Sequence, residues 1–371
     1  DIMRHLVKLS LVFALLISTT AKSEPIVESW FTELSGRYAR IYPTLADQNS
    51  GTSATTWSRG QGTQSLPTYA GVSEVSVTAT DVYIRTSGLG FHVMGPWYGD
   101  EAKQNLFPNY PSNRAAIYRF TRTPGTPPAN KTPTGLGAIG YFVDGIAMFD
   151  SRDAFSYSNA NGQDARPQTA FNGDGVWNRD AYVNESVTFD PANAHQAGPN
   201  HHYHANPPGL RFLLGGSVDY NPATNTYTES PNGKHSPILG WAQDGIPIYG
   251  PYGFSDPLDT NSAPRRMISG YQKRNLAMDA ARNSLPQWTN TLEGRSTTIA
   301  ANVNGPNVST QYPLGHYLED YEYKGDAGLT LGVDFDLDIH NVRFCKTPEY
   351  PDGVYAYFTN IEADGTPVFP Y

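Results

Sequence analysis

The sequence predicts a mainly β protein with loop-rich, Gly/Pro/Tyr-rich sheets, a duplicated β unit and few short helices. Three observations lead to this class. The 371 residues include 35 Gly, 29 Pro and 24 Tyr but only 16% charged residues, which favours turns and aromatic-faced strands. Several segments alternate apolar and polar residues, which is the period of a strand with one buried face. Two pairs of segments also resemble each other, which indicates an internal repeat.

The first residues have the pattern of an export signal. Arg4 and Lys8 supply positive charge, an apolar run follows from Leu9 to Ile17, and small residues end it near Ser23. The run is about half the roughly 20 apolar residues that a membrane-spanning helix needs. We therefore expect residues 1–23 to be a cleaved signal peptide. The mature protein is then expected to be secreted or periplasmic, without membrane insertion.

The rest of the chain divides into two expected regions. Residues 24–70 are expected to form an N-terminal segment, with a short helix between Ile26 and Tyr42. The stretch from Gln48 to Pro67 is rich in Ser, Thr and Gly without periodicity, which indicates a linker or long loop. Residues 71–371 are expected to form a single β-rich domain that contains the repeat.

Within this domain the local patterns predict several strands and one helix. Strands are expected from Val75 to Thr86 and from Ala116 to Thr121. After a Pro-rich loop, a strand pair is expected from Gly137 to Phe149, with its turn at an Asp-Gly pair. The helix is expected from Gly270 to Ser284, because Gly270 and Pro286 bound this stretch.

Two internal similarities indicate the duplicated unit. Residues 140–149 and 240–249 both contain an aromatic residue, an Asp-Gly turn and an apolar strand. Residues 201–206, followed by an Asp-Gly segment at 244–249, resemble residues 355–360, followed by an Asp-Gly segment at 364–369. We interpret these similarities as a duplicated β unit, and we expect the Asp144-Gly145 and Asp244-Gly245 turns to occupy equivalent places in the fold.

A group of histidines predicts a transition-metal site. His202 and His204 are two residues apart, a spacing that places both imidazoles on one face of a strand. The turn signal at 198–199 could fold His195 back beside them, which gives three imidazoles and leaves one coordination position open. That ligand set suits copper(II) or zinc. The ordinary alternative is that these are hydrogen-bonded structural residues or surface residues.

The repeat provides an internal comparison for this prediction. The second copy carries Ala356 and Phe358 where the first copy has His202 and His204. A fold shared by the two copies does not require the histidines, which favours a chemical role for them. Four of the nine histidines also fall within ten residues.

Other residues are weaker candidates for the same site. His235 could supply a further imidazole, whereas Asp244, His340 and Cys345 could orient a ligand from outside the first coordination sphere. For Asp244 the alternative role is in its own Asp-Gly turn. A thiolate from Cys345 would favour copper, but an isolated cysteine is more often a small buried apolar residue.

An oxygen-rich stretch leaves calcium open as a second kind of ion. Residues 172–180 contain Asn172, Asp174, Asn178 and Asp180, all with side-chain oxygens. The glycine falls too early in this stretch for an EF-hand loop, so calcium is the less favoured cofactor.

Three segments together resemble the YHYH-motif family of exported bacterial proteins. They are the run 201–204 (His-His-Tyr-His), the segment 240–252 and the tail 341–371. The likeness covers about residues 75–371. This chain departs from the pattern with His201 at the position of the motif's first Tyr, and with Val342 where Gly is expected. The resemblance implies export and, through the paired histidines, suggests a metal site, but it implies no particular reaction.

Composition and motifs exclude several classes of function. The net charge of −9 and the absence of basic runs argue against nucleic-acid binding and against anionic membrane surfaces. The single cysteine excludes an intrachain disulfide. No nucleophile elbow, phosphate loop or dinucleotide fingerprint stands out. The expected partners are therefore a small molecule or a metal ion.

Three functions remain open from sequence alone. The first is an exported copper or zinc enzyme with an open coordination position, for which an oxidoreductase is favoured over a hydrolase. The second is a non-catalytic extracytoplasmic copper-binding or delivery protein. The third is a carbohydrate- or surface-binding module, suggested by the 24 Tyr and 6 Trp residues, although β cores use aromatic residues as well.

Overall fold

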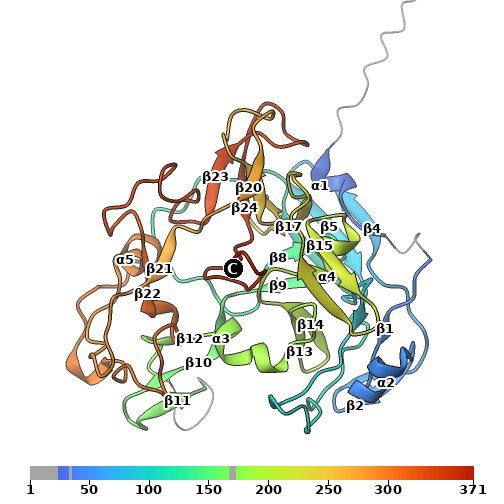
Figure 1. Cartoon of the computed structure of the whole chain (residues 1–371), viewed down its shortest axis with the longest axis horizontal. Coiled ribbons are helices and arrows are strands. Elements are labelled where there is room, and N and C mark those ends of the chain that lie inside the picture. The colour runs from blue at the N-terminus through green and yellow to red at the C-terminus, as the bar shows by residue number, and fades with distance from the viewer. Residues whose placement is uncertain (1–23, 33–35, 167–172) are drawn as a thin grey trace, which may run out of the picture.

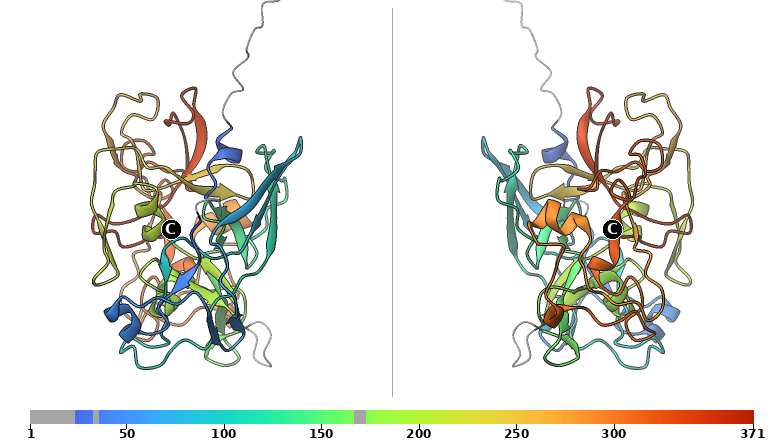
Figure 2. Two further views of the ribbon diagram at one scale, coloured as in Figure 1. Left: turned by 90° about the vertical axis from the view of Figure 1, so that its right-hand side faces the viewer. Right: turned by 90° about the vertical axis from the view of Figure 1, so that its left-hand side faces the viewer.

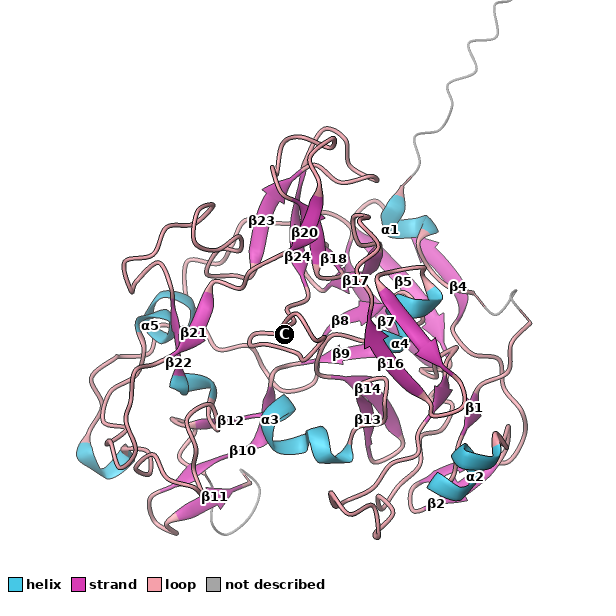
Figure 3. Cartoon of the chain, in the orientation of Figure 1, coloured by secondary structure: helices cyan, strands magenta, loops and turns pink. Residues whose placement is uncertain are grey.

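The computed structural model describes residues 24–32, 36–166 and 173–371, and its β character is plain in the ribbon (Figures 1 and 3). Short strands joined by long loops make up most of the described chain, and the longest of its α-helices has seven residues. The predicted fold class is thereby confirmed. No helix among the described residues has the length and apolar character to cross a membrane. The expected signal peptide, residues 1–23, lies outside the described residues.

An eight-stranded sheet forms the centre of the molecule and runs from β23 to β13 across Figure 1. Its strand order is β13-β14-β9-β8-β17-β18-β24-β23. The strands are β8 (Ala138–Phe142), β9 (Ala147–Phe149), β13 (Ala194–Ala197), β14 (Asn200–Tyr203), β17 (Ile238–Ala242), β18 (Pro247–Tyr249), β23 (Val342–Cys345) and β24 (Val354–Phe358).

The sheet consists of two similar halves that meet where β8 pairs with β17. In each half an antiparallel hairpin, β8-β9 or β17-β18, carries a register shift at the same place, after residue 138 or 238. An outer strand then runs parallel to the hairpin, β14 beside β9 and β24 beside β18. A last antiparallel strand, β13 or β23, closes each edge. The duplicated unit predicted from the sequence is therefore present in the fold.

The two Asp-Gly turns are equivalent, as the sequence predicts. Gly145 and Gly245 both have φ of 82°, in the left-handed region that favours glycine. The Asp144 carboxylate accepts a bond from the backbone N–H two residues on, and Asp244 does the same. Each carboxylate also accepts a bond from the Tyr hydroxyl of its parallel neighbour strand.

The repeat extends to a turn that the sequence comparison did not find. Asp190 precedes β13, and its Oδ1 accepts bonds from the backbone N–H groups of Ala192 and Ala194. Asp338 precedes β23, and its Oδ1 accepts the matching pair of bonds. An Asn at left-handed φ follows three residues after each Asp. Each half of the sheet thus begins its edge strand from the same carboxylate-capped turn.

Smaller sheets and short helices surround the central sheet, and the β4-β5 ribbon runs along one side of the molecule (Figure 2). The remaining strands are β1 (Arg40–Ile41), β2 (Trp57–Arg59), β3 (Gly62–Gln64), β4 (Val72–Val77), β5 (Asp81–Thr86), β6 (Val93–Met94), β7 (Ala116–Thr121), β10 (Arg152–Ser158), β11 (Gln163–Ala165), β12 (Asn178–Asp180), β15 (Val218–Asn221), β16 (Thr226–Glu229), β19 (Tyr252–Phe254), β20 (Pro264–Arg266), β21 (Tyr271–Lys273) and β22 (Tyr321–Tyr323). The helices are α1 (Pro25–Glu28), α2 (Leu45–Ser50), α3 (Ala181–Glu185), α4 (Pro208–Leu213) and α5 (Gln287–Glu293), with single 3-10 turns η2 (Ser186–Thr188), η3 (Ala301–Val303) and η4 (Leu318–Asp320).

The main hydrophobic core lies against the central sheet. Phe142, Tyr203, Trp241, Tyr249 and Phe358 are all at most 1% exposed and belong to one contiguous cluster. Both halves of the sheet contribute to this cluster. The two copies of the repeat therefore share one core.

Two local expectations differ from the structure. The stretch from 48 to 67 is no linker, because the β2-β3 hairpin forms there and Trp57 packs into a second core cluster. The predicted helix from Gly270 to Ser284 is also wrong. That segment contains β21, which pairs with β22, and the helix α5 begins only after Pro286. Pro286 stands at the start of α5, where the N–H that proline lacks has no partner within the helix, so this proline precedes a helix and does not end one.

The turn at Gly145 provides a stability test of the repeat. A Cβ at Gly145 would lie 2.2 Å from Thr86 Oγ1, whose hydroxyl donates to the Gly145 carbonyl. We expect Gly145→Ala to lower the free energy of unfolding by about 2–3 kcal/mol, from backbone strain plus the displaced Thr86. Gly162→Ala is the matched control, because Gly162 has φ of +65° and no atom within 4 Å of an added Cβ. Urea denaturation measures the free energy of unfolding of both variants. An equal decrease in the two would contradict the tight packing at the Gly145 turn.

Candidate metal centre

The hairpin of β13 and β14 brings three histidines together. His195 pairs directly with His202 in the register of this hairpin, and Gly198 makes the turn between the strands with φ of 60°. His204 lies two residues beyond His202, just after β14 ends. One ring nitrogen from each histidine lies within 4.8 Å of the others, and all three side chains are buried. His195, His202 and His204 are called the three-histidine cluster below.

Hydrogen bonds fix which nitrogen of His202 and His204 carries the proton. His202 Nδ1 lies 3.0 Å from the Asn200 carbonyl, and His204 Nδ1 lies 2.8 Å from the Asp150 carbonyl. A carbonyl oxygen can only accept, so each Nδ1 must donate. In the neutral rings, each Nε2 therefore presents a lone pair.

The proton on His195 is fixed through Thr188. The Thr188 hydroxyl donates to the Glu185 carbonyl at 2.7 Å, so its oxygen accepts from His195 Nδ1 at 2.8 Å. His195 Nε2 is buried and has no hydrogen-bond partner. All three rings thus have the same tautomer. Bonding the Nδ1–H of a histidine to an oxygen is the usual way in which proteins orient a ring for metal binding.

Two lone pairs of this cluster face each other. His202 Nε2 and His204 Nε2 are 3.1 Å apart, a separation that only a shared proton or a cation makes favourable. Burial is the main cause that lowers the pKa of His204 to about 4 and the pKa of His202 well below its usual value. This lowering of the pKa favours the neutral rings, each with its proton on Nδ1 and a lone pair on Nε2. A metal ion fits this donor set.

Aromatic rings enclose the cluster and keep it dry. Phe149 stacks on His202 with ring centroids 3.9 Å apart, and Phe189 lies parallel to His204 at 5.9 Å. Phe189 also meets His195 edge-on at 4.8 Å. This apolar shell disfavours a charged imidazolium and strengthens any bond between the nitrogens and a cation.

A carboxylate that the sequence analysis missed completes the site. Glu185, the last residue of α3, places Oε2 3.6 Å from His195 Nε2 and 3.5 Å from His204 Nε2. Its side chain is 26% exposed, so it lies on the solvent side of the buried rings. Burial, followed by repulsion from Asp153, raises the pKa of Glu185 to about 7. No local pattern marks Glu185 as part of the site, because only the connection from α3 to β13 returns the chain to it.

The other residues predicted for this site lie elsewhere. His235 precedes β17, three strands from β14 in the sheet, and packs among Tyr249, Phe254 and Phe358. Its Nδ1 bonds the Ser236 carbonyl at 2.8 Å.

The three candidates for an orienting role are also outside the cluster. Asp244 caps its own turn and accepts a bond from Tyr357. His340 is exposed before β23, and Cys345 is buried at the far edge of the sheet, where burial raises its thiol pKa to about 11. In the calcium candidate stretch, Asn172 lies outside the described residues, and the Asp180 carboxylate caps α3.

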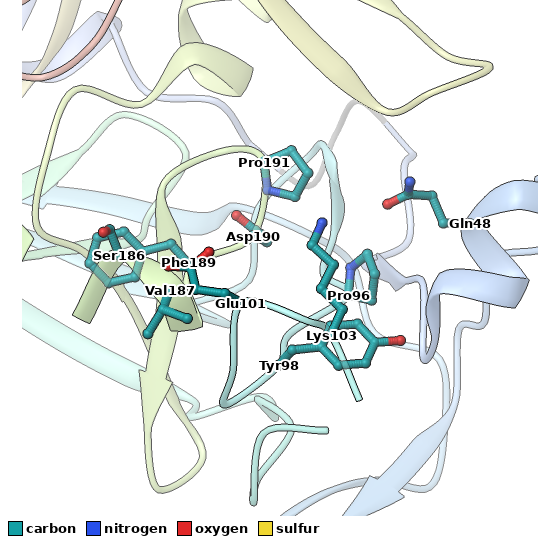
Figure 4. A pocket seen from close by; sticks show the side chains of 10 residues that line it. All are labelled: Gln48, Pro96, Tyr98, Glu101, Lys103, Ser186, Val187, Phe189, Asp190 and Pro191. Carbon is teal, nitrogen blue, oxygen red and sulfur yellow. The ribbon is translucent and has the colours of Figure 1, made fainter. Parts of the chain in front are cut away.

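A cavity open to solvent has Phe189, a residue of the aromatic shell, in its wall (Figure 4). Its volume is about 310 Å³, and polar and charged residues line it, among them Tyr98, Glu101 and Lys103. Ser186, Val187 and Phe189 line the cavity as well. Phe189 is therefore part of both the cavity wall and the aromatic shell of the cluster.

The fold and the site define a β-rich protein built on a duplicated sheet unit, with a buried histidine cluster on one copy. The model of the YHYH protein family matches residues 117–368, and the chain belongs to this family. The resemblance drawn from the motif residues is thereby confirmed. Neither the curated proteins nor the solved structures include a significant match to the chain.

The surroundings of His235 predict a pH-dependent stability. Burial lowers the pKa of His235 from 6.5 to about 4, with a smaller contribution from Arg343. Between these pH values the unfolded chain binds more protons, so the stabilisation is complete above pH 6.5 and is lost as the pH falls towards 4. From pH 6.5 to pH 4 we expect the free energy of unfolding of the parent to fall by on the order of 1–2 kcal/mol more than that of His235→Gln. This figure is reduced because the His235 side chain is partly exposed to solvent. Denaturant unfolding at several pH values, with chelator present, measures this; a pH-independent difference between the two proteins would contradict it.

Proposed function

We propose that this protein is exported and binds one copper or zinc ion through His195, His202 and His204, and that it works as a metalloenzyme. The convergence of three buried Nε2 lone pairs supports this proposal most strongly. A hydrogen-bonded structural cluster would use a proton donor between His202 and His204, but both Nδ1 atoms already carry the protons. Export rests on the signal-like N-terminus and on the family resemblance.

The donor set favours copper or zinc over other ions. Three imidazoles with second nitrogens bonded to oxygens are typical of both metals, whereas magnesium and calcium prefer oxygen ligands. Cys345 belongs to the other half of the sheet, so a thiolate does not contribute. A bound copper ion would supply redox chemistry and a bound zinc ion would supply a Lewis acid.

Glu185 is the residue of this chain best placed to move a proton at the site. Its carboxylate lies within 3.6 Å of two ligand nitrogens and on their solvent side. From there it can accept a hydrogen bond from a substrate or water that enters the open position. Thr188 and the carbonyls of Asn200 and Asp150 hold the rings, while Phe149 and Phe189 exclude bulk water.

The adjacent cavity supports a small polar substrate. Lys103 and Glu101 offer charges of both signs, and Tyr98 offers a hydroxyl and a flat ring. Phe189 lines this cavity and also packs against His195 and His204. Of the two reaction classes, an oxidoreductase is favoured because three imidazoles with an aromatic shell suit copper, and the chain has no hydrolase signature.

A second candidate, copper capture and delivery without turnover, follows from the position of Glu185. If its carboxylate fills the fourth position, the coordination sphere is closed and no site remains for substrate. The distinction between the two functions thus depends on the role of one side chain.

The metal content of purified protein tests the central proposal. Protein made without a histidine tag, stripped and reloaded with copper(II) or zinc, is expected to bind one ion more than the His202→Ala/His204→Ala variant binds. A ligand that binds only the native state stabilises it, by about 4 kcal/mol when the free metal concentration is a thousand times Kd. Chelator should therefore lower the melting temperature of the metal-loaded parent. His235→Gln and His340→Gln are matched controls and should keep both the ion and the shift. A double variant with unchanged metal content and chelator response would show that the site is elsewhere.

A Glu185→Gln variant distinguishes an enzyme site from a closed carrier site. If Glu185 is a proton acceptor, the variant keeps its copper affinity within about threefold, and the copper-loaded parent binds added azide in an open position. Loss of affinity by about 10–100-fold, together with a parent that does not bind azide, would favour the carrier function. Metal competition titrations and the azide-to-copper absorption band provide the two measurements.

A further inference from the structure

The opposite face of β14 carries a second group of metal-ligand side chains. His201 precedes His202, so its side chain points away from the three-histidine cluster. Ligand atoms of His92, Asp190 and His201 all lie within 4.8 Å of one another, and all three side chains are buried. We propose that these residues form a second metal site, for a divalent ion such as zinc or iron(II). His92, Asp190 and His201 are called the second cluster below.

Among the described residues, the ring nitrogens of the second cluster have no hydrogen-bond partner, although His92 Nε2 lies 3.7 Å from Asp190 Oδ2. Both nitrogens of His92 and both nitrogens of His201 are buried without a hydrogen bond. The His195 carbonyl lies near the His201 ring but outside hydrogen-bond geometry. Leaving a buried polar group unpaired costs about 1–3 kcal/mol. A metal ion between the two imidazoles would bind the ring nitrogens that lack hydrogen-bond partners.

Asp190 supplies the negative charge, and its two oxygens have separate roles. Oδ1 caps the turn before β13, a function that the repeat also gives to Asp338. Oδ2 accepts only the Gly95 N–H, at 2.8 Å, and lies 3.7 Å from His92 Nε2. The side chain of Asp190 is fully buried, and no Lys or Arg of the described residues forms an ion pair with it. A cation at Oδ2 would neutralise this buried carboxylate.

The second cluster exists only in one copy of the repeat. Residues before and after His92 cover this face of β14, and Trp97 donates to the Ala194 carbonyl at 2.9 Å. On the equivalent face of the other copy, Tyr355 and Phe344 are exposed. The Gly90 position also has no room for a side chain, because a Cβ there would lie 2.9 Å from the His92 ring. The covering segment and the ring it carries therefore fit this copy specifically.

The ligand set indicates the kind of ion. Two histidines and one carboxylate suit zinc, iron(II) or manganese more than copper(I), which prefers sulfur ligands. His201 stands where the family motif has Tyr, and the other copy carries Tyr355 at the same strand position. The second site is thus a property that His201 gives to this chain, and it is independent of the three-histidine cluster.

Zinc stoichiometry tests the second site. Untagged protein is stripped with chelator, dialysed against zinc alone in a weakly chelating buffer, and analysed for zinc per chain. We expect about two ions for the parent, about one for His92→Gln, and about one for His202→Ala/His204→Ala. His201→Tyr, which restores the motif residue, should also bind about one. His340→Gln, an exposed control outside both clusters, should bind two.

The outcomes separate the two sites. A parent zinc content that neither His92→Gln nor His201→Tyr lowers would overturn the second site. If the His202→Ala/His204→Ala variant and the parent bind the same single ion and His92→Gln binds none, the second site stands and the proposed function fails. Circular dichroism and melting curves identify folded variants, and either single variant suffices if the other does not fold.

Discussion

The pairing of β8 with β17 is the contact on which the architecture depends, because it joins the two copies of the repeat into one sheet. Gly140 and Gly240 lie at this seam. A Cβ on Gly240 would lie 2.5 Å from the Tyr141 carbonyl, and one on Gly140 would lie 2.8 Å from the Trp241 carbonyl. Only glycine permits this approach, and the approach places both hairpins over one core.

Because both copies fold in the same way, the sheet does not need the histidines. At the positions of His195 and His202, which pair across β13 and β14, the other copy has Arg343 and Ala356, which pair across β23 and β24. Arg343 donates to the Phe254 carbonyl, and Ala356 is fully buried. One copy is therefore stabilised by ordinary packing and side-chain bonds. The other copy holds neutral imidazoles, with their Nε2 lone pairs facing one another, among buried aromatic rings, and buried polar atoms without partners cost stability.

Adjacent residues of β14 serve two different surroundings. His202 faces the aromatic shell of Phe149 and Phe189, and His201 faces the segment around His92. Tyr203 points to the same side as His201 and donates to Asp144, a carboxyl whose pKa burial raises to about 6. The alternation of a strand is thus enough to separate two buried polar groups by the thickness of the sheet.

The sequence by itself determined the features that depend on local pattern: the β class, the two Asp-Gly turns, the repeat, the family, and the grouping of His195, His202 and His204 around a tight turn. These follow from spacing along the chain. The tertiary structure alone decided the role of Glu185, the pairing of His92 with Asp190 and His201, and the separation of His235 from the site. Those contacts join segments that are distant in sequence, and they depend on which strands become neighbours in the sheet, a choice made by long-range packing and not by local residue pattern.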